Sequence, residues 1–252
     1  MGALHAGHLS LVRAAKARCE AVAASIFVNP TQFGPSEDFS KYPRSFDADC
    51  VALEKEGVDI LFAPNVEEMY PKGESTWVYV EGLSERLDGR SRPGHFRGVT
   101  TVVSKLFHVI EPDVAFFGQK DAAQLAVIRR MVRDLNFPVE IVGCPIVREV
   151  DGLAMSSRNI YLSAEERVRA LLLHRALQTT EEKFRAGESS AALLGESARA
   201  IIAREPGVRL DYFEIVDPDL LEPVERIAQP ALVAVAAYVG STRLIDNIVL
   251  RP

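Results

Sequence analysis

The sequence predicts an α/β protein with a doubly wound parallel sheet, followed by a smaller α+β domain. Short apolar, β-branched segments alternate with amphipathic helical segments over roughly the first 150 residues. This alternation is typical of right-handed βαβ units on a parallel sheet. Beyond that point the pattern changes to two helical segments and then three strand-like segments, which is typical of an α+β domain.

In the first part of the chain, helical spacing of apolar residues predicts four helices and short apolar runs predict four strands. The helices are marked by Val12, Ala15 and Cys19; by Phe46, Cys50 and Leu53 within Phe46–Glu56; by the apolar face of Gly98–Ile110; and by Leu125, Ile128, Val132 and Leu135. The strands are Ala21–Val28 and Val58–Ala63, both expected to be buried, then Asp113–Phe117 and Val139–Val142.

In the second part, Ser163 and Glu166 form a capping-box sequence that starts a long helix towards Gly187. A shorter helix and three strands follow, at Ala191–Arg204, Asp211–Val216, Ala231–Val239 and Thr242–Leu250. We therefore predict two domains, 1–148 and 149–252, with Asp151–Asn159 as the hinge.

Composition excludes several classes of protein. The chain has 252 residues, is 48% hydrophobic and 25% charged, and carries a formal net charge of −6. No global basic field is present to hold a nucleic acid. The longest apolar stretch, Ala231–Val239, is about half the length needed to cross a bilayer. Neither a signal peptide nor a disulfide or zinc pattern among the three cysteines is apparent, so we expect a cytoplasmic protein without a membrane or nucleic-acid partner.

Three polar segments follow or precede predicted elements where an α/β sheet binds ligands, beyond the carboxyl ends of its strands. They are His5-Ala6-Gly7-His8, Asn29–Gly34 and Gly118–Asp121. Helix N-termini favour phosphate, and Gly7 lets a ligand approach the backbone. His5 and His8 can donate hydrogen bonds to phosphate oxygens, where negative charge develops in phosphoryl or nucleotidyl transfer.

Two further polar segments are Met155–Arg158 and Arg92–Val99, which add hydroxyls, guanidinium groups and a histidine. Each segment alone also fits a plain structural role, as a turn, a capping loop or a solvated ion pair such as Lys120 with Asp121. The function is supported by the whole set of segments in order.

That set resembles the pantothenate synthetase family, a branch of the HxGH nucleotidylyltransferases. The resemblance covers essentially the whole chain and is carried by MGALHAGH, SIFVNPTQF, YPR, RPGHFRGV, FFGQKD, DGLAMSSRN and RLIDN. It implies a Rossmann-like nucleotide- and pantoate-binding domain and a C-terminal lid domain. The implied reaction is ATP-dependent joining of pantoate to β-alanine through a pantoyl adenylate, with release of AMP and pyrophosphate.

The resemblance also implies roles for individual residues. His8, His5, Lys120 and Arg158 would be catalytic, and Gln32 and Gln124 would hold pantoate, with Gln32 also at the β-alanine position. ATP would contact Met1, Gly2, Ala3, Leu4, His5, Ala6, Gly7, His8, Gly118, Gln119, Lys120, Asp121, Val147, Met155, Ser156, Ser157 and Arg158. Mg²⁺ would bridge the phosphates without a protein ligand, and a homodimer is expected.

Two departures from the family pattern concern the Gly118–Gln124 region. Gln119 stands where an acidic residue is common, and Ala122 and Ala123 replace bulkier residues. A strand is also expected ahead of Met1, since a βα nucleotide site needs a strand to lead into its loop.

Two alternative functions remain from the sequence: another HxGH nucleotidylyltransferase acting on a phosphorylated acceptor, and a non-catalytic nucleotide-binding relative.

Overall fold

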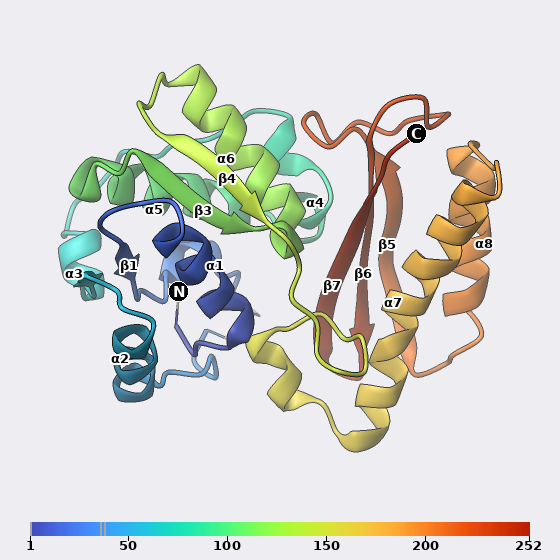
Figure 1. Cartoon of the computed structure of the whole chain (residues 1–252), viewed down its shortest axis with the longest axis horizontal. Coiled ribbons are helices and arrows are strands. Elements are labelled where there is room, and N and C mark those ends of the chain that lie inside the picture. Colours follow the sequence, from blue (N-terminus) through green and yellow to red (C-terminus); the bar gives the residue numbers. More distant parts are fainter. Residues whose placement is uncertain (1, 36, 38) are drawn as a thin grey trace. The chain divides into compact units, whose positions relative to one another are not determined.

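The computed structural model describes residues 2–35, 37 and 39–252. The chain divides into two compact units (Figure 1). The first runs from the N-terminus to Gly118 and includes Val127–Val147, and the second contains Gln119–Ala126 and Arg148–Pro252. Gln119–Ala126 groups with the C-terminal residues, where Asn247 hydrogen-bonds the backbone of Gln119 and Lys120. The two-domain division at residue 148 stays a prediction.

The first unit contains alternating helices and short strands. Its helical segments are α1 (Ala6–Lys16), η1 (Pro30–Gln32), α2 (Phe46–Lys55), α3 (Val66–Met69), η2 (Leu83–Glu85), α4 (Asp88–Ser91) and α5 (His95–Ile110). Its strands are β1 (Ala23–Ser25), β2 (Ile60–Phe62), β3 (Val114–Gly118) and β4 (Glu140–Cys144). Helix α6 (Ala122–Asp134) starts in the segment assigned to the second unit and ends in the first.

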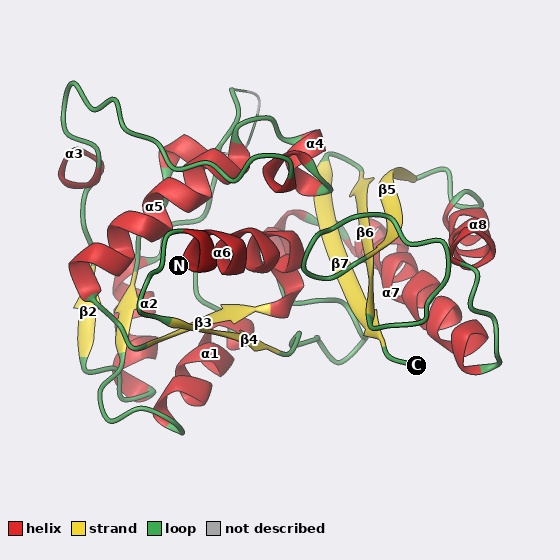
Figure 2. Cartoon of the chain, turned by 90° about the horizontal axis from the view of Figure 1, so that it is seen from above, coloured by secondary structure: helices red, strands yellow, loops and turns green. Residues whose placement is uncertain are grey.

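The strands of the first unit run parallel, as expected. β1 pairs with β2, with Ala24 opposite Leu61, and β3 pairs with β4, with Phe116 opposite Val142. Among the described residues these are two separate pairs. Figure 2 shows α1 on one side of β3 and β4, with α6 on the other. The α/β class with parallel strands is therefore confirmed, and the strand expected ahead of Met1 stays a prediction.

Four details of the expected first part are wrong. β1 and β2 are three residues each, shorter than the expected strands, and Ile60 in β2 is 59% exposed rather than buried. β2 pairs only with β1, so the other edge of β2 has no partner strand among the described residues. Phe46 is 50% exposed, and the buried side chains of α2 are Asp49 and Leu53. Leu135 lies just beyond α6 and is 53% exposed.

The second unit is an antiparallel sheet with two long helices on one face (Figure 1). Its helical segments are η3 (Gln119–Asp121), η4 (Ser157–Tyr161), α7 (Ala164–Arg185) and α8 (Ala191–Ile202), and its strands are β5 (Val208–Val216), β6 (Ala231–Val239) and β7 (Thr242–Leu250), in the order β5-β6-β7. The Ser163–Glu166 capping box is confirmed, with both reciprocal hydrogen bonds present. β6 and β7 have the expected bounds.

The apolar side chains of α7, α8 and the three strands form the core of this unit. β6 is the central strand of the sheet and carries buried side chains at almost every position. Within the described residues, no helix is long and apolar enough to cross a bilayer.

Candidate active site

The HAGH segment forms the N-terminus of α1. His5 is the N-cap residue, and its Nδ1 accepts a hydrogen bond from the Gly7 N–H at 3.2 Å. In return, the His8 Nδ1 accepts from the His5 N–H at 3.3 Å, so the two histidines form a reciprocal capping box. The ring centroids are 4.0 Å apart. The structure thus brings the two predicted catalytic histidines together.

This capping geometry fixes the tautomer of both rings. A nitrogen that accepts a hydrogen bond carries no proton, so each neutral ring has its proton on Nε2. Each imidazole can therefore donate from Nε2 while its Nδ1 stabilises the helix N-terminus. Donors at a helix N-terminus suit phosphate oxygens, because the helix dipole also favours negative charge there.

Asp49, which the sequence reasoning missed, holds the residues before the histidines. Its side chain is 3% exposed, and its two oxygens accept the N–H groups of Ala3 and Leu4, both at 2.8 Å. Ala3 has a φ of 49°, in the left-handed region that L-residues disfavour. Two charge-assisted hydrogen bonds offset that strain. The sequence feature that could have indicated this role of Asp49 is an acidic residue in the first turn of α2.

Gln32 ends the turn η1, and the neighbouring Asn29 orients its amide. Asn29 is 3% exposed, and its Nδ2 donates to the Gln32 Oε1 at 3.2 Å and to the Gly98 carbonyl at 3.1 Å. Because the Gln32 oxygen already accepts this bond, the Nε2 hydrogens of Gln32 are directed elsewhere. An amide N–H is a suitable donor to a carboxylate or hydroxyl group.

The residues Arg92 and His95 hold the backbone of Gln32. The His95 Nδ1 lies 2.8 Å from the Gln32 carbonyl, and the Arg92 Nη1 lies 3.0 Å from the His95 Nε2. Since arginine can only donate, Nε2 accepts and Nδ1–H donates to Gln32. Burial, together with the Arg92 charge, lowers the pKa of His95 to about 4. His95 is therefore neutral at pH 7.

Glu37 balances the charge of Arg92 in this cluster. Arg92 donates to the two Glu37 oxygens at 2.8 and 2.6 Å. Burial alone would raise the pKa of Glu37, but the hydrogen bonds and the charge of Arg92 outweigh it, and the pKa is lowered. The RPGHFRGV sequence therefore supports the Gln32 segment, a role that the sequence alone did not assign.

Gly98 allows α5 to pack directly on η1. A Cβ at this position would lie 2.4 Å from the Thr31 carbonyl oxygen and 2.7 Å from the Gln32 nitrogen. Both are far inside van der Waals contact, so only glycine fits without a backbone shift.

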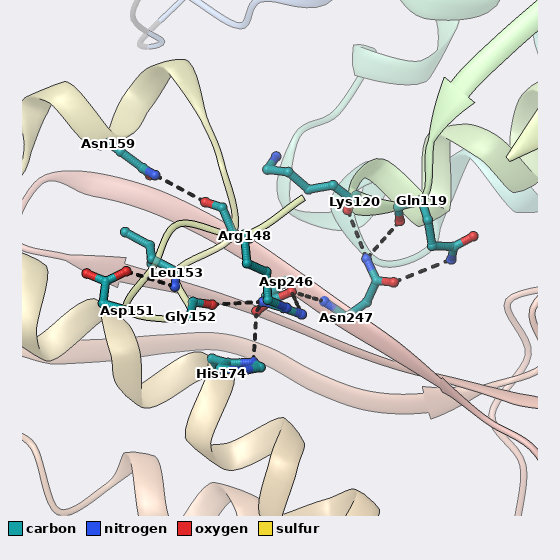
Figure 3. Close-up of polar contacts among 11 residues, drawn as sticks. Gln119, Lys120, Arg148, Asp151, Gly152, Leu153, Asn159, His174, Asp246 and Asn247 are labelled. Atoms are coloured by element: carbon teal, nitrogen blue, oxygen red, sulfur yellow. Dashed lines mark hydrogen bonds and ion pairs between the residues drawn. The ribbon is translucent and has the colours of Figure 1, made fainter. Parts of the chain in front are cut away.

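In the second unit, the segment Gln119–Asp121, predicted to bind nucleotide, is the turn η3, and Lys120 is its candidate phosphate ligand (Figure 3). The Lys120 Nζ lies 3.5 Å from an Asp121 oxygen, and its side chain is 20% exposed. Asn247 on β7 donates to the backbone carbonyls of Gln119 and Lys120, both at 2.9 Å. Gln124 lies in α6, about one turn beyond Asp121.

Met155–Arg158 follows a closed turn in the predicted hinge. The Glu149 N–H donates to the Leu153 carbonyl at 2.8 Å, and Arg148 and Ala154 form an isolated bridge. Ser156 then caps η4 by accepting from the Arg158 N–H at 3.2 Å. This hydrogen bond holds Ser156 and Arg158, two of the predicted ATP contacts, close together.

The other predicted site residues are placed as follows. Gly2, Ala3 and Leu4 precede α1, Ala6 and Gly7 are in its first turn, Gly118 ends β3, and Val147 follows β4. Met155 and Ser157 are half-buried, at the start of η4. Met1 lies outside the described residues. In the part of the chain that the structure describes, no group of three or more His, Cys, Asp or Glu side chains could hold a metal ion.

The sequence and fold match one family of enzymes. The family model described as pantoate-beta-alanine ligase matches residues 1–249. The chain belongs to the pantoate-beta-alanine ligase family. As a member, it is a ligase that forms a carbon–nitrogen bond between pantoate and β-alanine.

Curated relatives support this membership in the pantoate-beta-alanine ligase family. A pantothenate synthetase of Acidobacterium capsulatum is 66% identical over 250 residues, covering 99% of this chain and 84% of the relative. A pantothenate synthetase of Koribacter versatilis is 63% identical over 251 residues, covering 100% of this chain and 86% of the relative.

Solved structures of the pantoate-beta-alanine ligase family show the same fold. The crystal structure of the pantothenate synthetase from Thermus thermophilus matches with a TM-score of 0.97 at 50% identity, covering 100% of this chain and 91% of the other. A Francisella tularensis pantoate-beta-alanine ligase, complexed with beta-gamma ATP and beta-alanine, matches with a TM-score of 0.81 at 33% identity, covering 98% of this chain and 86% of the other.

Proposed function

We propose that this ligase works in two steps through a pantoyl adenylate. In the first step, a pantoate carboxylate oxygen attacks the α-phosphate of ATP and pyrophosphate leaves. In the second, the β-alanine amine attacks the acyl carbon, AMP leaves and the amine loses a proton. The support is the family membership, together with the Francisella relative that is complexed with beta-gamma ATP and beta-alanine.

The observation that carries the proposed chemistry is the reciprocal capping of His5 and His8 through Nδ1, which leaves Nε2 as the donor atom of each neutral ring. Both rings are held by capping at 3.2 and 3.3 Å, so they are organised before a ligand arrives. We assign His8 as the catalytic histidine and His5 as its partner on the phosphates. Donors fixed in this way stabilise charge that develops on phosphate oxygens during adenylation.

Two cations complete the proposed phosphate contacts. Lys120 offers a compact charge, and Arg158 offers a planar guanidinium that can bind two phosphate oxygens. The other proposed ATP contacts are the segments named above: Met1 to His8, Gly118 to Asp121, Val147 and Met155 to Arg158.

Gln32 and Gln124 are the proposed pantoate contacts, and Gln32 also contacts β-alanine. The hydrogen bond from Asn29 to the Gln32 Oε1, at 3.2 Å, directs the Gln32 Nε2–H groups away from Asn29. Those N–H groups can donate to a carboxylate of either substrate. Neutral amides also fit an unphosphorylated acceptor better than the phosphorylated acceptor of other nucleotidylyltransferases.

Mg²⁺ would bind together with ATP, held by the nucleotide rather than by a protein side chain. The buried carboxylate nearest the HAGH segment, Asp49, already accepts the Ala3 and Leu4 N–H groups with its two oxygens. Mg²⁺ commonly binds nucleotides with few protein ligands, keeping water in its remaining positions. When bound, it would offset phosphate charge.

We also propose a cytoplasmic homodimer, with 149–252 acting as a lid that excludes water from the adenylate.

Pyrophosphate exchange tests the two-step proposal. Protein, ATP and Mg²⁺ with pantoate but no amine should exchange labelled pyrophosphate into ATP, and AMP should be released only after β-alanine is added. Exchange that is equally fast without pantoate would overturn the adenylate step, and no exchange with any acceptor would indicate a non-catalytic relative.

A variant at Gln124 tests the proposed pantoate contact. Gln124→Ala should raise the KM for pantoate more than the KM for ATP, because it removes a contact to one substrate only. An unchanged KM for pantoate would remove Gln124 from the proposed site.

A further inference from the structure

We propose that Asn247 is a positioning residue that holds the Gln119–Lys120 backbone in the conformation from which Lys120 contacts ATP. Asn247 lies in the RLIDN sequence on β7 and belongs to none of the segments assigned to substrates. The inference rests on the ATP-binding role proposed for Lys120.

The Asn247 amide makes three hydrogen bonds to the Gln119–Lys120 segment (Figure 3). Its Nδ2 donates to the Gln119 and Lys120 carbonyls, both at 2.9 Å, and its Oδ1 accepts from the Gln119 Nε2 at 3.4 Å. The Asn247 side chain is 2% exposed. A single buried group therefore fixes two consecutive carbonyl groups.

The chemistry of this contact requires an amide. Two carbonyls need two N–H donors on one side chain, and the Gln119 Nε2 needs an acceptor beside them. Asparagine supplies both, whereas aspartate supplies only acceptors and would place a negative charge against two carbonyl oxygens. A buried carbonyl that loses its donor is costly, so the segment would move to find another partner.

Asp246 anchors Asn247 from the other face of the strand, since neighbouring residues in a strand point in opposite directions. The Asp246 Oδ1 accepts a hydrogen bond from the backbone N–H of Asn247 at 2.8 Å. Its two oxygens also accept from Arg148 at 2.6 and 3.0 Å, and Asp246 is 4% exposed. Arg148 donates in addition to the Gly152 carbonyl at 3.2 Å.

The Asp246–Asn247 pair thus joins the turn before Met155–Arg158 to the turn that carries Lys120. The lysine stem is flexible, so its Nζ can be directed only if the backbone beneath it is fixed. Here the Lys120 carbonyl itself is held by Asn247. A shift of this carbonyl moves the point from which the ammonium group reaches a phosphate.

The test compares Asn247→Asp, Lys120→Ala and the double variant by pyrophosphate exchange in the full chain. Asn247→Asp should lower kcat/KM for ATP by roughly 10- to 100-fold, the usual effect of a displaced positioning group, and leave the KM for pantoate within about twofold. The double variant should be within about twofold of Lys120→Ala alone, because Asn247 acts through Lys120.

Leu250→Ala is the matched control, because Leu250 is 2% exposed on the same strand and belongs to the core rather than to this network. It should lower the melting temperature without changing kcat/KM for ATP at a temperature where the variant is folded. Asn247→Ala is a second variant with the same expected kinetics as Asn247→Asp, should the aspartate fail to fold.

Three outcomes would overturn the inference. Normal ATP kinetics in Asn247→Asp beside an impaired Lys120→Ala would reject the role of Asn247 and leave the proposed function intact. Fully additive effects in the double variant would show that Asn247 does not act through Lys120. Unchanged ATP kinetics in Lys120→Ala would reject both the inference and the proposed role of Lys120.

Discussion

The HAGH segment and the Pro30–Gln32 turn both belong to the first unit, yet they are held in different ways. HAGH is held mainly by its own side chains, through capping bonds between residues two and three positions apart. Pro30–Gln32 depends on α5, because His95 contacts Gln32 and Gly98 accepts a hydrogen bond from the adjacent Asn29, both from more than 60 positions away in the sequence. Local contacts make one site predictable from its motif, and distant contacts determine the other.

The largest effect is expected at His8, where capping and catalysis can be separated. His8→Ala should lower the adenylation rate by roughly 10²- to 10³-fold, because a fixed donor to the phosphates is lost. It should also lower the free energy of unfolding by about 1 kcal/mol, through loss of a cap. Pyrophosphate exchange and urea unfolding measure the two effects.

His8→Gln is the matched control for that experiment. Glutamine at this position of a capping box can still accept the His5 N–H, so stability should return without activity. Near-normal exchange in either variant would show that His8 acts only as a cap.

Gly98→Ala tests the distant support of Gln32. The new methyl group would lie 2.4 Å from the Thr31 oxygen, so η1 must shift and the KM for pantoate should rise at least about tenfold. The free energy of unfolding should fall by about 1–3 kcal/mol from overpacking. Gly195→Ala, in α8, is the control, since its new Cβ meets only the flexible end of Arg199. If the KM for pantoate in Gly98→Ala equals that in Gly195→Ala, α5 does not position Gln32.

Asp49→Asn would show how far the HAGH segment depends on tertiary contacts. Aspartate accepts from Ala3 and Leu4, whereas asparagine can accept only one of these N–H groups well. We expect the free energy of unfolding to fall by about 1–3 kcal/mol, together with a higher KM for ATP. Ser163→Ala, which removes the cap of α7, should cost about 1 kcal/mol and leave the KM for ATP unchanged. Equal effects of both variants on ATP would contradict a specific role for Asp49.

The lowered pKa of His95 predicts how the stability of the chain depends on pH. Its pKa is about 4 in the folded chain and about 6.5 when unfolded, so the unfolded state binds more protons between these values. Stability is therefore full above pH 6.5 and is lost as the pH falls towards 4. From pH 7 to pH 5 this group should remove about 1–2 kcal/mol of stability.

Urea unfolding of the parent chain and His95→Asn at both pH values measures the difference. Asparagine can still donate to the Gln32 carbonyl but does not titrate, so the variant should lose less stability on acidification. The same pH dependence in both proteins would assign the effect to other groups.

Several elements were predictable because their signals are local. The Ser163–Glu166 capping box, α7 and the full extents of β6 and β7 follow from periodicity and from residues a few positions apart. The same holds for the position of HAGH at a helix start. The sequence did not reveal that both histidines also cap the helix, because Nδ1 geometry depends on the rotamers adopted in the fold.

Other features could not be predicted because exposure depends on which neighbour covers a face. Phe46 and Ile60 are apolar and in period, yet each is at least 50% exposed. Asp49 is charged and yet buried, because two backbone N–H groups satisfy its oxygens. Asn247 gave one usable signal, a polar residue beside Asp246 between apolar residues of the strand, but its partners are 127 and 128 positions away.

The sequence by itself determined the α/β class, the order of the elements and the residue types available for chemistry, because periodicity, capping and motifs act within a few residues. Only the tertiary structure decided which groups hold Gln32 and Lys120 in place. Hydrogen bonds from His95 and Asn247 form only when distant segments are folded together, so their geometry depends on the whole unit.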